Sequence, residues 1–393
     1  PVTDSLNEYS VCAISMESQV KGPWRVSYLW FMQNDPWNMF ASFDESRWLE
    51  QAKGLEVNPM HAEGWQMPLR GEKKMDWPLL PPKVMGSQKS PNGWELQQRI
   101  GANAPMLQGL IHGVEGLRME ASGQLKAMLE GVHLEMISLH LDGCYSEAVA
   151  EDLSVIGADA KLRGSWLCSG NAVESLQHMK GVHEMFPALR SWTCPSADWL
   201  KNGVGRAAVM ARIGWALDGL MTGLGVDDMR AHATQKVVLN WVVGTHVLVE
   251  IASLRALRLF WSRWLAYHEL PDTPVWIDAI NGHYPADPTT IQDHLIPQSS
   301  GAYAAVIGGA DGIETLPHDT LDDGAAGSAE GLRWARNVQH IMREESGLHR
   351  VFDPMGGSFV VESWTHAILD QAWKEYVSGL VVETAAENVN SDA

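Results

Sequence analysis

From residue 92 onward, short apolar runs alternate with stretches in which apolar residues recur every three or four positions. Short apolar runs are typical of strands, and the longer period is typical of helices packed on one face. We predict strands at 95–100, 116–120, 136–141, 162–167 and 189–193, and helices between them at 104–112, 122–129, 145–156 and 172–179. This alternation favours a parallel α/β sheet, but the period alone does not distinguish a closed barrel from an open sheet.

The second half of the chain continues with longer apolar patterns. They predict a helix over 197–223 and a longest helix over 237–268, with Glu250, Arg255, Arg258 and Arg263 away from its apolar stripe. Near the C-terminus we predict a strand ending at 306–307, a helix from N-cap Ser328 to Gly347, and extended segments at 348–352 and 359–361. These elements fit another strand–helix repeat.

The first 90 residues differ from this pattern. Prolines interrupt them throughout, and tryptophans alternate with Met and Pro. We therefore predict two parts, an irregular N-terminal extension at 1–90 and a main domain at 91–393. The extension is either a segment that wraps a partner with aromatic anchors or a loosely packed appendage.

Composition argues against several kinds of partner, membrane segment and metal site. The net charge of −19 disfavours nucleic acid and anionic membranes as partners. The sequence contains no uninterrupted run of 18 apolar residues, so we expect no membrane span and a soluble protein. Its four cysteines show no C-x-x-C spacing, which predicts neither a disulfide framework nor a zinc site and favours a reducing cytoplasm. Acidic clusters at Asp227–Asp228 with His232, and at Asp319 with Asp322–Asp323, are interpreted as solvated turns, so no metal site is predicted.

Two stretches near the C-terminus carry a resemblance to a known family. Residues 336–362 read R-N-x-Q-x-I-x-x-E-E-S-G-x-x-R-V-x-D-P-x-G-G-S-x-x-V-E, and residues 308–319 read G-G-A-D-x-I-x-x-L-P-x-D. Both resemble the methylmalonyl-CoA mutase family, and the second is more similar to its small, cobalamin-free subunit. The motif positions, which we interpret as structural, are Gly308, Gly309, Asp311, Asp319, Arg336, Asn337, Glu344, Glu345, Arg350, Asp353, Gly356 and Gly357.

The resemblance implies a (β/α)8 TIM barrel whose active relatives use adenosylcobalamin. No D-x-H-x-x-G sequence is present to supply the cobalt ligand of those relatives, and only 377–393 follow the barrel, so we expect no cobalamin domain here. Where the resemblance places a substrate-binding histidine, the stretch 196–203 has Asp198 instead. The stretch 278–284 lacks the arginine that pairs with the substrate carboxylate, and its His283 and Tyr284 remain weak candidates for substrate binding.

These substitutions imply a small, non-catalytic subunit in a heterodimer with a large catalytic subunit. That partner would bind adenosylcobalamin and acyl-CoA, and the complex would interconvert methylmalonyl-CoA and succinyl-CoA in the cytoplasm. One alternative is an active acyl-CoA mutase barrel that uses His283 and Tyr284 together with a separate cobalamin-binding chain. Another is a stand-alone binding or scaffolding barrel.

Overall fold

The computed structural model describes residues 93–391, except residue 123 and the stretches 157–161, 225–226, 282–293, 321–326 and 352, together with two short strands before them. These strands, β1 (His61–Ala62) and β2 (Trp65–Gln66), pair antiparallel. The chain divides into two compact units, 1–59 and 60–393. The prediction for 1–90 therefore falls almost wholly outside the described residues.

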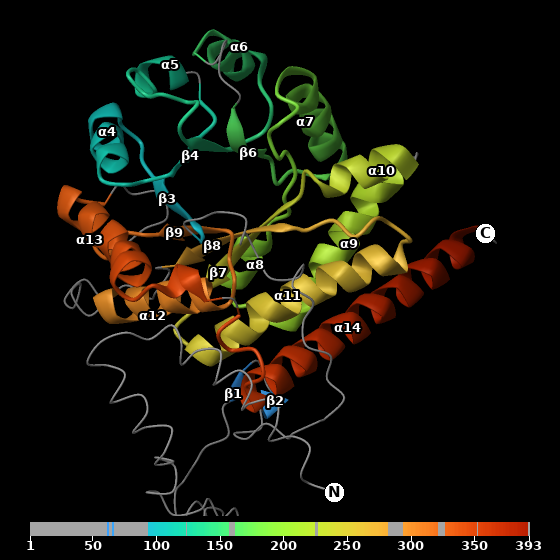
Figure 1. Cartoon of the computed structure of the whole chain (residues 1–393). Helices are drawn as coiled ribbons and strands as arrows, with labels where there is room; N and C mark the ends of the chain where they lie inside the picture. Colours follow the sequence, from blue (N-terminus) through green and yellow to red (C-terminus); the bar gives the residue numbers. More distant parts are fainter. Residues whose placement is uncertain are drawn as a thin grey trace, which may run out of the picture. The chain divides into compact units, whose positions relative to one another are not determined.

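A single parallel sheet organises the described part of the second unit (Figure 1). Its strand order is β6-β5-β4-β3-β9-β8-β7. The strands are β3 (Glu95–Arg99), β4 (Gly116–Glu120), β5 (Ser138–Asp142), β6 (Arg163–Leu167), β7 (Val238–Val243), β8 (Trp276–Asn281) and β9 (Gly312–Thr315). Each neighbouring pair is parallel, so the first strand of the sheet lies between the second and the last.

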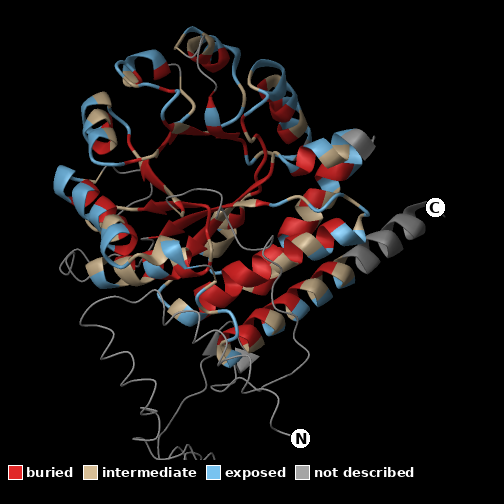
Figure 2. Ribbon diagram, viewed as in Figure 1, coloured by how far each residue is buried: buried red, intermediate tan, exposed pale blue. Residues whose placement is uncertain are grey.

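The sheet is curled, and a short segment connects its two end strands. Arg190 bridges to Ser165 on β6, and Trp192 bridges to Val237 immediately before β7. Only these two isolated bridges form where a strand was predicted at 189–193, because the amides of Ser191 and Trp192 both donate to the carbonyl of Lys236. In Figure 2 the buried strands surround the middle of the unit and the helices lie outside them.

Helices follow the strands on the outer side of the sheet. In the first half these are α4 (Asn103–Ile111), α5 (Leu125–Met128), α6 (Glu147–Ile156) and α7 (Ala172–Met185). In the second half they are α8 (Ser196–Lys201), α9 (Arg206–Leu224), α10 (Asp227–Thr234), α11 (Val247–Tyr267), α12 (Leu295–Ile307), α13 (Ala329–His340) and α14 (Phe359–Ser391). A π-helical turn (Ile341–Glu345) and a 3-10 turn (Leu348–Arg350) continue α13. None of the described helices combines the length and apolar character needed to cross a membrane.

The apolar core lies between the sheet and these helices in two clusters. One packs β3–β6 against α4–α7, and the other packs β7–β9 against α9, α11, α12 and α14. Four tryptophans, Trp166, Trp241, Trp264 and Trp364, are among the largest fully buried side chains. Since α11 is buried on nearly all sides, Glu250, Arg255 and Arg258 are buried too, and only Arg263 of the four charged residues named above reaches solvent.

Several predicted elements are correct in type, but some are wrong. The 237–268 pattern is a buried strand, β7, followed by α11, because a strand buried on both faces is as continuously apolar as a helix. Residues 306–307 end α12 instead of a strand, and 348–350 form a 3-10 turn. Residues 359–361 begin α14, and the 197–223 pattern is split into α8 and α9.

The cysteines provide a further correction. Cys144 follows β5, Cys168 follows β6, and the structure joins them in a disulfide, with Cα atoms 4.5 Å apart. The prediction that no disulfide forms is wrong for this pair, because sequence spacing does not reveal that neighbouring parallel strands bring their ends together. Cys194 is free and buried.

Candidate functional site

The inner face of the curled sheet carries charged side chains where an apolar filling is common. Alternate residues of a strand point to the same face, and on this sheet those residues include Gln97, Arg118, His140, Asp278 and Glu314, all buried. We define the interior ion cluster as Glu95, Arg99, Arg118, His140, Asp142, Asp278 and Glu314. Its members come from β3, β4, β5, β8 and β9.

Arg118 lies at the centre of the cluster. Its Nε is 3.1 Å from Asp142 Oδ2, and its Nη1 is 3.4 Å from Asp278 Oδ2. Its Nη2 donates to Asn240 Oδ1 on β7 at 3.1 Å. Since β4 and β7 are four places apart in the strand order, this last bond crosses the interior instead of following the sheet.

A second arginine supports the same carboxylates. Arg99 donates from Nη2 to Asp142 Oδ2 at 2.8 Å and from Nε to Glu314 Oε1 at 2.9 Å. Although burial opposes ionisation of Asp142, the two guanidinium groups hold the pKa of that carboxyl below its usual range. Burial alone would lower the pKa of Arg118, but Asp142, Asp278 and Glu314 together raise it. Asp142 and Arg118 therefore stay charged and paired at neutral pH.

His140 forms the other buried ion pair of the cluster. Its Nε2 lies 2.6 Å from Glu95 Oε1, and its Nδ1 lies 2.9 Å from Ser165 Oγ. Burial opposes ionisation of Glu95, yet the His140 ring lowers the pKa of that carboxyl to about 2. Burial likewise acts to lower the pKa of His140, but Glu95 outweighs it and raises that pKa above its ordinary value.

Both ring nitrogens of His140 are thus engaged, and so are both carboxylate oxygens of Asp278. Asp278 Oδ1 accepts from Gln97 Nε2 at 2.8 Å and from Trp276 Nε1 at 2.7 Å, while Arg118 faces Oδ2. No group of three or more His, Cys, Asp or Glu side chains suited to a metal ion occurs among the described residues. The polar groups of the described interior are thus already bonded to each other.

The family-motif residues lie outside this interior and connect helices. Asp353 and Glu362 both accept from Arg255 on α11, the latter through Oε1 at 2.5 Å. The amide of Gly357, at φ +81°, donates to the same Glu362 oxygen at 3.0 Å, and Gly356 donates its amide to the Asp353 carbonyl. The D-P-x-G-G motif is therefore a turn that fixes the start of α14 to α11.

A second motif aspartate repeats this arrangement. Asp311 Oδ2 accepts from Arg258 at 2.7 Å and from the Ile277 amide at 2.8 Å, which joins α11 to β8 and to the start of β9. Gly308 is the C-cap of α12, and Gly309 adopts φ +80° in the turn that follows. Arg255 and Arg258 of α11 thus both bind carboxylates of the motif segments around that helix.

Of the remaining motif residues, two form hydrogen bonds in or next to α13 and the others are exposed. Arg336 donates to Gln98 at 2.9 Å, and Asp319 accepts from the amide of Ser328, the N-cap of α13. Asn337, Glu344, Glu345 and Arg350 are exposed. Asp198 is exposed on α8. His283 and Tyr284 lie outside the described residues, so their predicted role stays a prediction.

Sequence reasoning missed the interior ion cluster. Its signal was present, because the strand segments Gly116–Glu120 and Ser138–Asp142 place polar residues at alternate positions between apolar ones. In a sheet covered by helices on its outer face, such alternation indicates a polar inner face.

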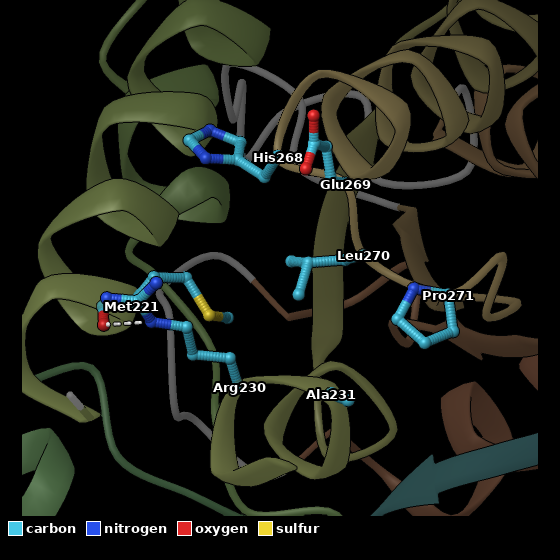
Figure 3. A pocket seen from close by; sticks show the side chains of 7 residues that line it. All are labelled: Met221, Arg230, Ala231, His268, Glu269, Leu270 and Pro271. Carbon is cyan, nitrogen blue, oxygen red and sulfur yellow. Dashed lines mark hydrogen bonds between the residues drawn. The ribbon is translucent and has the colours of Figure 1, made fainter. Parts of the chain in front are cut away.

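A separate cavity of about 330 Å³ is lined by residues that do not belong to the interior ion cluster (Figure 3). Its lining comes from the end of α9, from α10 and from the turn after α11: Met221, Arg230, Ala231, His268, Glu269, Leu270 and Pro271. Next to it, Asp218 accepts from the Tyr376 hydroxyl at 2.9 Å and lies 2.9 Å from His268 Nε2. These bonds hold α14 against α9 and α11.

Comparison with known proteins agrees with this architecture. Residues 209–378 match the family model for methylmalonyl-CoA mutase. These residues include α11, the Arg255 and Arg258 anchors and both C-terminal motifs. The chain is related to the methylmalonyl-CoA mutases.

Within that class, two small subunits are similar to most of the chain, as the motifs predicted. The chain is 27 % identical over 365 residues to the methylmalonyl-CoA mutase small subunit of Streptomyces virginiae, covering 81 % of this chain and 56 % of that subunit. It is 26 % identical over 372 residues to the small subunit of Propionibacterium freudenreichii subsp. shermanii, covering 82 % and 55 %. With the mitochondrial methylmalonyl-CoA mutase of Bos taurus it shares 32 % identity over 163 residues, 40 % of this chain and 20 % of that protein. The chain thus spans little more than half the length of the small subunits that it matches.

Proposed function

We propose that this chain is the small, non-catalytic subunit of a heteromeric, adenosylcobalamin-dependent methylmalonyl-CoA mutase. In this proposal its curled sheet is a complete (β/α)8 barrel with 190–192 as a minimal eighth strand. The observation that carries the proposal is Arg118, which is 1 % exposed and reaches across the interior to Asp278 and Asn240.

The interior ion cluster disfavours substrate binding in this barrel. A radical rearrangement needs a dry interior with free donors aimed at the thioester carbonyl and at the substrate carboxylate. Here the guanidinium groups of Arg99 and Arg118 are each shared between protein carboxylates. An acyl-CoA entering this space would have to separate the buried pair of Arg118 with Asp278, which leaves uncompensated buried charge and costs several kcal/mol.

The chemistry therefore belongs to a large partner subunit in the cytoplasm. When bound by that partner, adenosylcobalamin supplies the radical that starts the interconversion of methylmalonyl-CoA and succinyl-CoA. The present chain contributes a rigid surface that stabilises the partner. Its stiffness comes from Arg255 and Arg258, which tie α11 to the motif turns around it.

Co-expression with the large mutase subunit of the same host tests this proposal. We expect a one-to-one complex by size exclusion with mass analysis, and mutase activity that is lost when the large subunit's active site is disabled. Replacing His283→Ala and Tyr284→Phe in the present chain should leave the activity of the complex unchanged. Turnover by the present chain with added cofactor and no large subunit would refute a non-catalytic role, and loss of turnover in His283→Ala within an intact complex would favour an active barrel.

A further inference from the structure

The disulfide between Cys144 and Cys168 lies at the carboxyl ends of two adjacent parallel strands. Asp142 on β5 is in register with Leu167 on β6, and the Gly143 amide donates to the Leu167 carbonyl at 2.8 Å. The ladder therefore continues by one bond beyond each strand and brings the next residues together. The two sulfurs join the loop after β5, which leads into α6, to the loop after β6, which leads into α7.

The two cysteine residues differ in their exposure to solvent. Cys144 is exposed, whereas Cys168 is 0 % exposed beneath the loop that leads to α7. Thiol–disulfide exchange proceeds by attack of a thiolate along a path that reaches one sulfur, so access decides which sulfur is attacked. An incoming thiol meets Cys144, and Cys168 is the sulfur that leaves.

The surrounding contacts hold the strand ends without the disulfide. Trp166 Nε1 donates to the Gly143 carbonyl at 2.9 Å, and the Tyr145 ring lies 5.4 Å from the Trp166 ring. On the other side, Asn171 and Glu174 form a capping box that fixes the start of α7. Opening the disulfide therefore leaves both cysteines close together and ready to close it again.

We propose that Cys144 and Cys168 form a reversible dithiol–disulfide couple, with Cys144 as the sulfur that exchanges with small thiols such as glutathione. In reduction, a thiolate attacks Cys144 Sγ, the Sγ–Sγ bond breaks, and Cys168 leaves as a thiolate that takes up a proton. A second thiolate then attacks the mixed disulfide and releases the oxidised small thiol and the Cys144 thiolate. Two small thiols are thus oxidised for each protein disulfide reduced. This couple is independent of the subunit role proposed above.

Peptide mapping of the native, full-length chain reads out the couple directly. Lys161 and Arg163 lie between the two cysteines, so trypsin places them on different peptides that remain linked only by the disulfide. After treatment of the folded chain with reduced glutathione and trapping with iodoacetamide, we expect the linked peptide to disappear and Cys144 to be alkylated roughly tenfold faster than Cys168. Oxidised glutathione should restore the link. Cys194, which is free and buried with its pKa raised to about 12 by burial, is the internal control and should stay unlabelled while the chain is folded.

Two matched variants test which sulfur is accessible. Cys168→Ser leaves Cys144 without its disulfide partner, and oxidised glutathione should convert Cys144 to a mixed disulfide. Cys144→Ser leaves the buried Cys168 of the pair, which should react roughly tenfold more slowly. Equal rates in the two variants would overturn the assignment of Cys144. A native chain whose linked peptide resists reduced glutathione until it is denatured, or whose cysteines do not link under oxidised glutathione, would overturn the reversible couple.

Discussion

Replacing Arg118→Met tests the energetic role of the interior ion cluster. The substitution keeps a side chain of similar length but removes the cation that faces Asp142, Asp278 and Glu314. Arg99 still pairs with Asp142 and Glu314, so these two carboxylates retain a partner. Asp278 keeps only the neutral donors of Gln97 and Trp276. One fully buried carboxylate therefore loses its ion-pair partner, and only the more distant charges of His140 and Arg190 still act on it.

The expected loss in free energy of unfolding follows from this single carboxylate, Asp278. Removing one partner of a buried ion pair costs about 3–5 kcal/mol, most of it the penalty for the uncompensated charge. Since Asp278 retains two hydrogen bonds and the other carboxylates retain Arg99, we expect a loss at the lower end, about 3 kcal/mol. The double substitution Arg118→Met with Asp278→Asn removes the stranded charge and should recover roughly 1–2 kcal/mol of this loss.

Urea unfolding followed by tryptophan fluorescence measures these differences. Arg333→Met is the matched control, because Arg333 pairs with Glu330 at 3.4 Å while both side chains are more than half exposed. Exposed pairs contribute about 0–1 kcal/mol, so the control should barely move the midpoint. A loss below about 1 kcal/mol in Arg118→Met, or no recovery in the double variant, would refute the view that Arg118 and Asp278 form a tightly coupled buried pair.

Three further outcomes are expected. In Glu95→Gln the loss of stability relative to the parent should be largest, roughly 2 kcal/mol, between about pH 4.5 and 6.5. This loss of stability should shrink as the pH rises through the raised pKa of His140, because the parent then loses the ion pair. It should also shrink as the pH falls toward about 2, where Glu95 takes up its proton. A loss that does not depend on pH in thermal melts would contradict the pairing. Arg255→Met should lower the free energy of urea unfolding by about 3–5 kcal/mol, because it leaves Asp353 and Glu362 without their ion-pair partner. The control is Arg263→Met, which should have almost no effect because its partner Asp370 is 76 % exposed. Equal effects of the two substitutions would contradict the structural role of the motif turn. Tyr376→Phe removes the hydroxyl that donates to Asp218 and should lower the free energy of unfolding by about 1 kcal/mol. Relative to the parent, the variant should show faster amide hydrogen exchange at α14, with less change at α4. Unchanged exchange at α14 would show that this bond does not hold the helix.

The sequence alone predicts those parts of the fold in which local pattern and burial agree. The strands near 95, 116, 138 and 163 were predicted because Gly or Asp bounds each short apolar run, and Ser328 was predicted as an N-cap from its side chain alone. Val238–Val243 was mistaken for helix because both faces of that strand are buried. The local spacing of apolar residues does not distinguish a strand buried on both faces from a buried helix.

The candidate site was harder to predict, because its residues meet only through the register of the sheet. Arg118 and Asp278 are separated by 160 positions, and their contact depends on which strands become neighbours. Likewise, Cys144 and Cys168 are 24 residues apart, and only the parallel pairing of β5 with β6 brings them together. The C-terminal motifs did indicate a family and a rigid turn, but not that Arg255 would be the residue enclosed by that turn.

The position of β3 between β4 and β9 has a consequence for how the chain folds. Glu95 is in register with Gly312, more than 200 positions later, so one edge of β3 has no partner until almost the whole domain has been synthesised. Contacts so distant in sequence are slow to form because the intervening chain must first be ordered. Until β8 and β9 arrive, Arg118 can pair with Asp142 but not with Asp278 or Glu314. We therefore expect the nascent chain to hold a half-formed sheet with an open edge and an unbalanced charge, and the sheet to become stable only when its last strand is in place.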